Sequence, residues 1–283
     1  MFLATVPPMV VAADVHPRVS VSAVSSWTWT LEEDLRFWAS AGIEHVGLSF
    51  RKLKKAGLPA AAGRVRDAGL RVSNIVELGW WSLDDHATWG RQQARLVQAL
   101  DAAVVTGAAC LVLTSGPQGR LPWDDALAAL AEALAPVSEE SRTRGVVLTL
   151  ENTGPLRLDL SFVTTLRDAI DAARMLGIGA CMEVNSCFAE RALDGTIAAA
   201  HDVLEHVQVN DFVIGSLCTP DRAVPGDGDI PLEGILQSLD GAGYGGALEL
   251  EMVGPRIEAE GYEQAIVRGA GYMSRLLRAL DDR

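Results

Sequence analysis

Short apolar runs alternate with amphipathic segments along most of the chain. From position 18 onward, each run rich in Val, Ile and Leu ends at a turn, and a segment with apolar residues at helical spacing follows it. The runs predict eight strands, at 19–24, 45–50, 70–76, 109–115, 146–151, 179–184, 206–209 and 246–251. The segments between them predict helices at about 30–41, 53–68, 84–106, 123–144, 161–176, 189–200, 231–242 and 261–280.

Local end signals support these boundaries. Thr30 is followed three residues later by Glu33, which is the spacing of a capping box, and Gly42 stands where the same helix should stop. The run at 146–150 ends abruptly in Glu151 and Asn152 and then in the loop formers Thr153, Gly154 and Pro155, so Glu151 is expected at the C-terminal end of a buried strand.

The strands are apolar throughout and do not alternate, which indicates a parallel sheet covered on its faces by helices. Eight such units favour a closed (β/α)8 TIM barrel, because no glycine-rich GxGxxG turn of a doubly wound sheet follows the first strand. No change of composition marks a linker, so residues 1–283 are interpreted as one α/β barrel domain. In such a barrel the chemistry belongs at the C-terminal ends of the strands.

Composition narrows the classes of function. The 24 Lys and Arg residues against 37 Asp and Glu residues give a net charge of −13, which argues against a nucleic-acid or anionic membrane surface. The four cysteines lack CxxC spacing and are expected to be reduced thiols. Met1–Asp14 is apolar but is interrupted by Pro7 and Pro8, which disfavours a signal peptide, and no run is long enough to span a membrane. We therefore expect a cytoplasmic protein.

Acidic and amide side chains stand at several strand ends. They are Glu77, Glu151, Glu183, Gln208, Glu249 and Glu251. Glu249 and Glu251 lie on the same face of their strand, with Glu251 nearer the mouth. Carboxylates gathered at one mouth raise one another's pKa unless a cation neutralises them. All-oxygen donors favour Mg²⁺, Mn²⁺ or a similar hard ion over structural zinc.

The order and spacing of several segments carry a resemblance to a known family. They are LTLEN (148–152), CMEVNS (181–186), HVQVND (206–211), RAVPGDGDIP (222–231) and GAGYGGALELE (241–251). Together they resemble the sugar phosphate isomerase/epimerase superfamily with the xylose-isomerase-like barrel, which includes ketose 3-epimerases, inosose dehydratases and 3-dehydroshikimate dehydratases. The resemblance covers most of the chain, because the unit at 30–50 also resembles the family's opening.

The resemblance implies roles for particular residues. It makes Glu151, Glu183, Gln208 and Glu251 the ligands of a divalent metal, either Mn²⁺ or Mg²⁺ with Co²⁺ as a further candidate. In the epimerases of this superfamily the first and last of these glutamates resemble an acid/base pair on opposite faces of the substrate, so Glu151 and Glu251 are the expected catalytic residues. Arg222, ahead of PGDGD, matches the arginine that holds substrate oxygens.

The sequence departs from the family's usual residues at three positions. Glu183 stands where Asp is usual, Gln208 where His is usual, and Ser186 where a second His is usual. Gln at the third ligand position resembles some dehydroshikimate dehydratases, so a dehydratase of a cyclic keto-polyol is the alternative activity. A catalytically degenerate binding barrel is the second alternative. A DNA-repair endonuclease of this barrel type would need several His ligands and a basic face, and the sequence offers neither.

The expected substrate is a small neutral hydroxyketone. Arg222 is the main basic residue near the strand ends, and a phosphate group would need more basic residues to bind it. Trp27 and Trp80, with their neighbours Trp29 and Trp81, are expected to wall one side of the mouth, beside Glu77 and Ser186 as further substrate contacts. The long loop at 210–230 is expected to fold over the substrate. The five histidines are not expected to bind metal, and a homo-oligomer is compatible with this interpretation.

Overall fold

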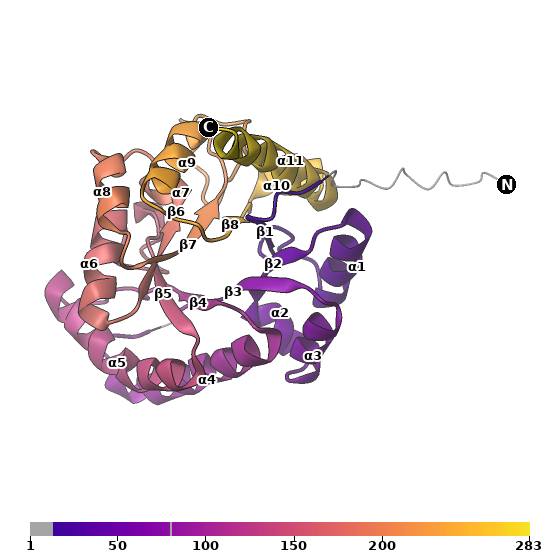
Figure 1. Cartoon of the computed structure of the whole chain (residues 1–283). Coiled ribbons are helices and arrows are strands. Elements are labelled where there is room, and N and C mark those ends of the chain that lie inside the picture. Colours follow the sequence, from indigo (N-terminus) through magenta and orange to yellow (C-terminus); the bar gives the residue numbers. More distant parts are fainter. Residues whose placement is uncertain (1–13, 80) are drawn as a thin grey trace.

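Eight parallel strands close into a barrel in chain order, with β8 bonded back to β1 (Figure 1). The computed structural model describes residues 14–79 and 81–283, so the N-terminal apolar run up to position 13 and Trp80 lie outside the described residues. The strands are β1 (Val19–Ser22), β2 (His45–Ser49), β3 (Arg71–Glu77), β4 (Cys110–Leu113), β5 (Val147–Glu151), β6 (Gly179–Glu183), β7 (Leu204–Val209) and β8 (Leu248–Leu250). The predicted TIM barrel is therefore confirmed.

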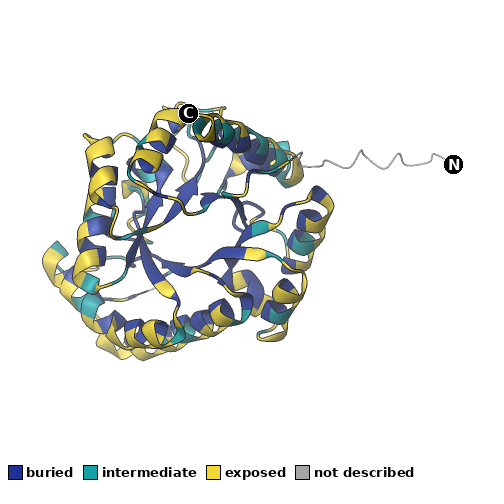
Figure 2. Cartoon of the chain, viewed as in Figure 1, coloured by how far each residue is buried: buried dark blue, intermediate teal, exposed yellow. Residues whose placement is uncertain are grey.

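Helices surround the barrel and turn their apolar faces toward it, while their outer faces are exposed (Figure 2). They are α1 (Leu31–Ala41), α2 (Phe50–Lys55), α3 (Ala60–Asp67), α4 (Trp89–Thr106), α5 (Trp123–Arg144), α6 (Leu166–Leu176), α7 (Val184–Cys187), α8 (Leu193–Ala199), α9 (Leu232–Gly241), α10 (Pro255–Glu260) and α11 (Tyr262–Asp281). Two 3-10 turns, at His86–Thr88 and Pro155–Arg157, complete the elements. In the described part of the chain, no helix is both long and apolar enough to cross a membrane.

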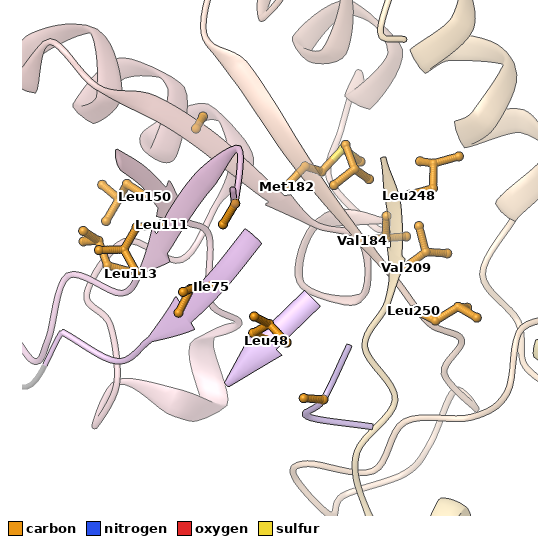
Figure 3. Close-up of a cluster of buried hydrophobic side chains, with 14 of the residues drawn as sticks. Leu48, Ile75, Leu111, Leu113, Leu150, Met182, Val184, Val209, Leu248 and Leu250 are labelled. Atoms are coloured by element: carbon orange, nitrogen blue, oxygen red, sulfur yellow. The ribbon is translucent and has the colours of Figure 1, made fainter. Parts of the chain in front are cut away.

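Alternate residues of each strand point in opposite directions, and this alternation positions the site. Leu148 and Leu150 of β5 join the large core between the strands and the helices, as do the corresponding residues of the other strands (Figure 3). Thr149 and Glu151 therefore face the barrel interior. The same parity turns Glu183, Gln208 and Glu251 inward, because the residues beside them in sequence belong to that core.

The predicted end signals of α1 are present. Thr30 and Glu33 form the capping box, and Gly42 ends the helix in the left-handed conformation at φ +71°. The expected helix at 53–68 is wrong, because it is two helices, α2 and α3. Gly57 between them has φ +86°, and Pro59 lacks the N–H that a continuing helix needs.

Other boundaries also differ from the expected ones. The helix predicted from 161 begins at Leu166, because Ser161 forms an isolated parallel bridge with Gly116. Helix α10 was not predicted; its short Pro255–Glu260 segment follows a glycine at φ +137°. These differences lie outside the strand ends, so they leave the predicted site at the mouth of the barrel.

Candidate active site

Four of the predicted residues lie side by side at the C-terminal end of the barrel. Glu151 ends β5, Glu183 ends β6, and Gln208 is next to last on β7. Glu251 follows β8 directly, and its backbone N–H donates to the carbonyl of Val209 at 3.1 Å. Because Glu183 pairs with Gln208 in the β6–β7 register and β5, β6, β7 and β8 are neighbours, the four side chains converge.

Each of the three carboxylates is oriented by a donor on one oxygen. Thr153 Oγ1 donates to Glu151 Oε1 at 3.1 Å, and Gln208 Nε2 donates to Glu251 Oε2 at 2.5 Å. Glu183 Oε1 accepts from the side-chain amide of Asn210 at 2.8 Å and from the backbone N–H of Asn185 at 3.1 Å. Its other oxygen, Oε2, is buried without a hydrogen-bond partner in the described structure.

Asparagines that were not predicted as site residues hold this arrangement in place. The carboxamide of Asn152 accepts from the backbone N–H of Glu183 at 2.8 Å and donates to the carbonyl of the same residue at 3.2 Å. Asn210 links Glu183 to the backbone carbonyl of Glu251 at 3.1 Å. Asn152 directly follows one strand-end glutamate, and Asn185 follows another by two positions, which is the signal in the sequence that could have found them.

Arg222 reaches Glu183 from the long loop between β7 and α9. Its Nη2 lies 3.5 Å from Glu183 Oε1. With the carboxamide oxygen of Asn185 turned toward it, the guanidinium also donates through Nε at 3.2 Å and through Nη1. The site therefore combines three carboxylates with the positively charged guanidinium of Arg222.

Burial and mutual repulsion raise the pKa of these acids. The pKa of Glu151 is raised to about 8, first by burial and then by the charge of Glu183, against the lowering effects of Thr153 and Arg222. The pKa of Glu251 is raised well above its ordinary value by burial and by the other glutamates. Burial also raises the pKa of Glu183, with Arg222 opposing it. Each of these glutamates therefore binds a proton more readily than a free carboxylate does, and a bound cation would relieve the same repulsion.

The donor set fits a hard divalent cation by its chemistry, because three mutually repelling carboxylates and a carboxamide are oxygen ligands. The unpartnered Oε2 of Glu183 is an oxygen that such an ion would satisfy. Within residues 14–79 and 81–283, no three His, Cys, Asp or Glu side chains already lie close enough together to share a metal ion. The four predicted ligands are therefore neighbours at the strand ends, but their side chains do not form a closed coordination shell.

A second polar layer lies deeper in the barrel, below the carboxylates. His206 Nε2 is 2.8 Å from Glu249 Oε2, which also accepts from Asn74 Nδ2 at 3.3 Å. A Cβ on Gly47 would lie 1.7 Å from Glu249 Oε1, so only glycine leaves room for this carboxylate. His206 is the first residue of the strand predicted at 206–209, but it lies within β7, where its ring pairs with Glu249.

The other side chains predicted to contact the substrate lie in different parts of the barrel. Trp27 is 40% exposed after β1, and its ring stacks on the Arg51 guanidinium at 4.1 Å. Ser186 lies beside the loop after β5, since a Cβ on Gly154 would be 3.3 Å from its hydroxyl. Glu77 shares the face of β3 with the core residue Ile75 and pairs with Arg95 of α4, so its side chain lies between barrel and helices.

The tryptophans expected to wall the mouth also differ from one another. Trp81 is buried, and Trp29 packs edge-on against Phe37 and Tyr262. Trp80 lies outside the described residues. Among the described tryptophans of the expected wall, Trp27 is the exposed one.

The loop at 210–230 is tied down at its base, where its two ends meet. The Asp211 carboxylate accepts from the backbone N–H groups of Phe212, Gly226, Gly228 and Ile230, at 2.8–3.0 Å. The backbones of Asp211 and Ala223 also exchange two hydrogen bonds, at 3.0 and 2.7 Å. The base of the loop is thus a fixed platform that carries Arg222.

Known proteins resemble this chain in sequence and in fold. The model of the xylose isomerase-like TIM barrel family matches residues 35–275. An inosose isomerase of Halalkalibacterium halodurans is 27% identical over 140 residues, and the match spans about half of each protein, 47% of this chain and 49% of the relative.

Solved structures share the fold. Protein SMc04130 from Sinorhizobium meliloti 1021 is 24% identical with a TM-score of 0.82, covering 90% of this chain and 97% of that one. An IolI protein with a bound zinc atom is 16% identical with a TM-score of 0.79, covering 92% and 97%. A 3-keto-D-glucoside 4-epimerase from E. coli is 17% identical with a TM-score of 0.69, covering 88% and 97%.

Proposed function

The chain belongs to the xylose isomerase-like TIM barrel family, and on this basis we propose that it is a divalent-metal-dependent isomerase or epimerase. Its substrate is a keto sugar, a keto-polyol or a similar small hydroxyketone, and the reaction moves a proton at the carbon next to the carbonyl. The observation that carries the proposal is the convergence of Glu151, Glu183 and Glu251 at one end of the barrel, where burial and repulsion raise the pKa of each.

The residues available to hold the cation are Glu151, Glu183, Gln208 and Glu251, since they supply the oxygen ligands at this end of the barrel. A divalent cation bound there supplies positive charge that polarises a carbonyl and makes the adjacent C–H bond more acidic. Mn²⁺ and Mg²⁺ fit the all-oxygen donors best, and Co²⁺ is a further candidate.

Glu151 and Glu251 are the proton carriers in this proposal. One carboxylate accepts the proton from the carbon next to the carbonyl, and the electron pair of that C–H bond spreads onto the carbonyl oxygen. The other carboxyl group then donates a proton. Without a bound cation, a pKa of about 8 keeps Glu151 mostly protonated at neutral pH. A bound cation favours the ionised carboxylate, which is the form that accepts a proton.

The other side chains hold the substrate and the carriers. Arg222 binds a substrate oxygen, and Asn185 fixes the direction of its guanidinium. Gln208 and Thr153 orient the two proton carriers through one oxygen each. Return of the proton to the opposite face of the same carbon epimerises it, and return to the neighbouring carbon moves the carbonyl.

Exchange of the substrate proton with solvent tests this proposal. The Mn²⁺-loaded protein is incubated in D2O with a panel of ketoses and inososes, and NMR follows loss of the C–H signal next to the carbonyl. We expect exchange that fails in Glu151→Gln and in Glu251→Gln and persists in Glu263→Gln, a control on the exposed side of α11.

The products distinguish the alternatives. Loss of water from the substrate would replace the isomerase with a dehydratase. Absence of exchange across the panel, with Mn²⁺ bound, would favour a binding barrel without turnover.

A further inference from the structure

Two loops at the mouth are joined beside Arg222. Asp221, the preceding residue, accepts from Arg256 Nε at 3.1 Å and from Ser216 Oγ at 2.5 Å. Asp221 is only 6% exposed, whereas the Arg256 side chain is 49% exposed. Arg256 is on α10, which follows β8, so the ion pair links the β7–α9 loop to the segment after Glu251.

The two backbones also touch at this point. Gly254 has φ +137°, and a Cβ there would lie 2.7 Å from the carbonyl oxygen of Pro220 and 2.8 Å from the Cα of Asp221. The backbone N–H of Arg222 donates to the carbonyl of Val253 at 3.0 Å. The contact is therefore built from one ion pair, one backbone hydrogen bond and one close approach that glycine alone allows.

This contact has a direct relation to the proposed proton chemistry. Arg222 comes from one of the joined loops and Glu251 from the other, three residues before Gly254. The guanidinium of Arg222 must lie within reach of Glu183 Oε1, 3.5 Å away, while its backbone is carried by the long loop between the end of β7 at Val209 and the start of α9 at Leu232. An arginine side chain has many rotamers, and the position of its backbone limits which of them bring the guanidinium within reach of Glu183.

We propose that Asp221 and Arg256 are positioning residues that set the guanidinium of Arg222 relative to the catalytic carboxylates. This inference rests on the proposed substrate-binding role of Arg222, and it adds two residues that neither touch the carboxylates nor bind substrate. The ion pair holds the β7–α9 loop in a fixed position against the segment after β8. It acts on the site through Arg222, which follows Asp221 directly.

The same region offers a matched control. Arg268 of α11 is 41% exposed and pairs with Asp227 of the same loop at 2.6 Å and with Glu260 of α10 at 2.8 Å. Its contact with Asp227 holds the part of the loop that follows the bridge between Asp211 and Ala223, whereas Asp221 precedes Ala223. Arg268→Gln therefore removes two ion pairs from the same region without touching the residue next to Arg222.

Chemical modification of Arg222 tests the proposal without a substrate. Phenylglyoxal is added to wild type, Arg256→Gln and Arg268→Gln, and peptide mass spectrometry follows the modification rate of Arg222. We expect a rise of about fivefold or more in Arg256→Gln, since the guanidinium leaves its partners, and little change in Arg268→Gln. Equal rates in the two variants would overturn the proposal, because the pair would then be a general anchor.

Kinetics of the D2O exchange give the second measurement. With the panel compound that wild type exchanges, Arg256→Gln should raise KM about tenfold with kcat changed far less, and Arg256→Lys should recover part of the loss. In an Arg222→Lys background the further effect of Arg256→Gln should vanish, since interacting positions are not additive. Full additivity would contradict the proposal. If no panel compound exchanges, the proposed function fails while the modification rates still decide this inference.

Discussion

At the scale of single residues, the buried acids of the site depend on the folded environment for their protonation. Glu151 ends a strand, where the sequence alone predicts an ordinary carboxylate, but burial and then the charge of Glu183 raise its pKa to about 8. A raised pKa means that the folded protein binds this proton more tightly than the unfolded chain does.

This shift predicts how stability depends on pH. The stabilisation from protonated Glu151 is fully present below the unfolded pKa of about 4.5 and is lost as the pH rises toward 8. In EDTA-treated protein, Glu151→Gln should therefore lose less stability than wild type between pH 5 and pH 8. Each kcal/mol of difference in the free energy of unfolding corresponds to about 2–4 °C in Tm for a domain of this size. Thermal melts across this range measure it, and parallel curves for the two proteins would contradict the assignment.

Gly47 gives a second prediction at this scale. Alanine there would place Cβ against Glu249 Oε1 and within 2.5 Å of Asn74 Oδ1, inside the closed barrel. We expect Gly47→Ala to lower the free energy of unfolding by about 3 kcal/mol or more, as overpacking does. Urea unfolding measures it.

The control for Gly47 is a glycine of helix α9. Gly234→Ala meets no atom within 4 Å and should raise stability by about 0.5–1 kcal/mol, through helix propensity. A Gly47→Ala protein as stable as the Gly234→Ala protein would show that the deeper polar layer is not closely packed.

At the scale of elements, a buried ion pair holds α1, α2 and the loop after β1 together. Lys52 of α2 donates to Asp34 of α1 at 2.6 Å and to the carbonyl of Ser26 at 2.9 Å, and both charged side chains are buried. Burial raises the pKa of Asp34 to about 6, while Lys52 lowers it. The pair anchors the loop that carries Trp27.

Removing one partner should be costly, because it leaves a buried charge. Lys52→Met is expected to reduce the free energy of unfolding by about 3–5 kcal/mol at pH 8. Because Asp34 without Lys52 binds a proton more readily in the folded state, this deficit should shrink as the pH falls toward 5.

Chemical denaturation at both pH values measures the effect of Lys52→Met. The double variant Asp34→Leu with Lys52→Met should recover much of the loss at pH 8. A deficit that does not depend on pH would argue for lost packing and against an uncompensated charge.

At the scale of the whole molecule, the barrel brings together carboxylates that are about 30 or more residues apart in sequence. An ion bound to them in the folded state stabilises the whole domain, by about 2.7 kcal/mol at a concentration of 100 times Kd. Mn²⁺ should therefore raise the Tm of the EDTA-treated wild type and leave that of Glu183→Gln almost unchanged. An equal Tm rise in both proteins would place the ion elsewhere.

Much of this protein could be predicted from its sequence. The eight strand-and-helix units, the capping box at Thr30 and the acids at the strand ends follow from local patterns, because periodicity and cap chemistry act over a few residues. The break at Gly57–Pro59 was also present in the sequence, but the helical spacing on both sides of it favoured one continuous helix.

The tertiary structure decided which residues meet. Glu77 and Glu151 look alike in sequence, each an acid at the end of a strand, yet strand parity turns Glu77 toward Arg95 and Glu151 toward the barrel interior. The asparagine contacts, the link between His206 and Glu249 and the join between Asp221 and Arg256 unite residues from separate units. Sequence patterns are local, whereas barrel closure sets the register between strands, and that register determines the charges each carboxylate faces.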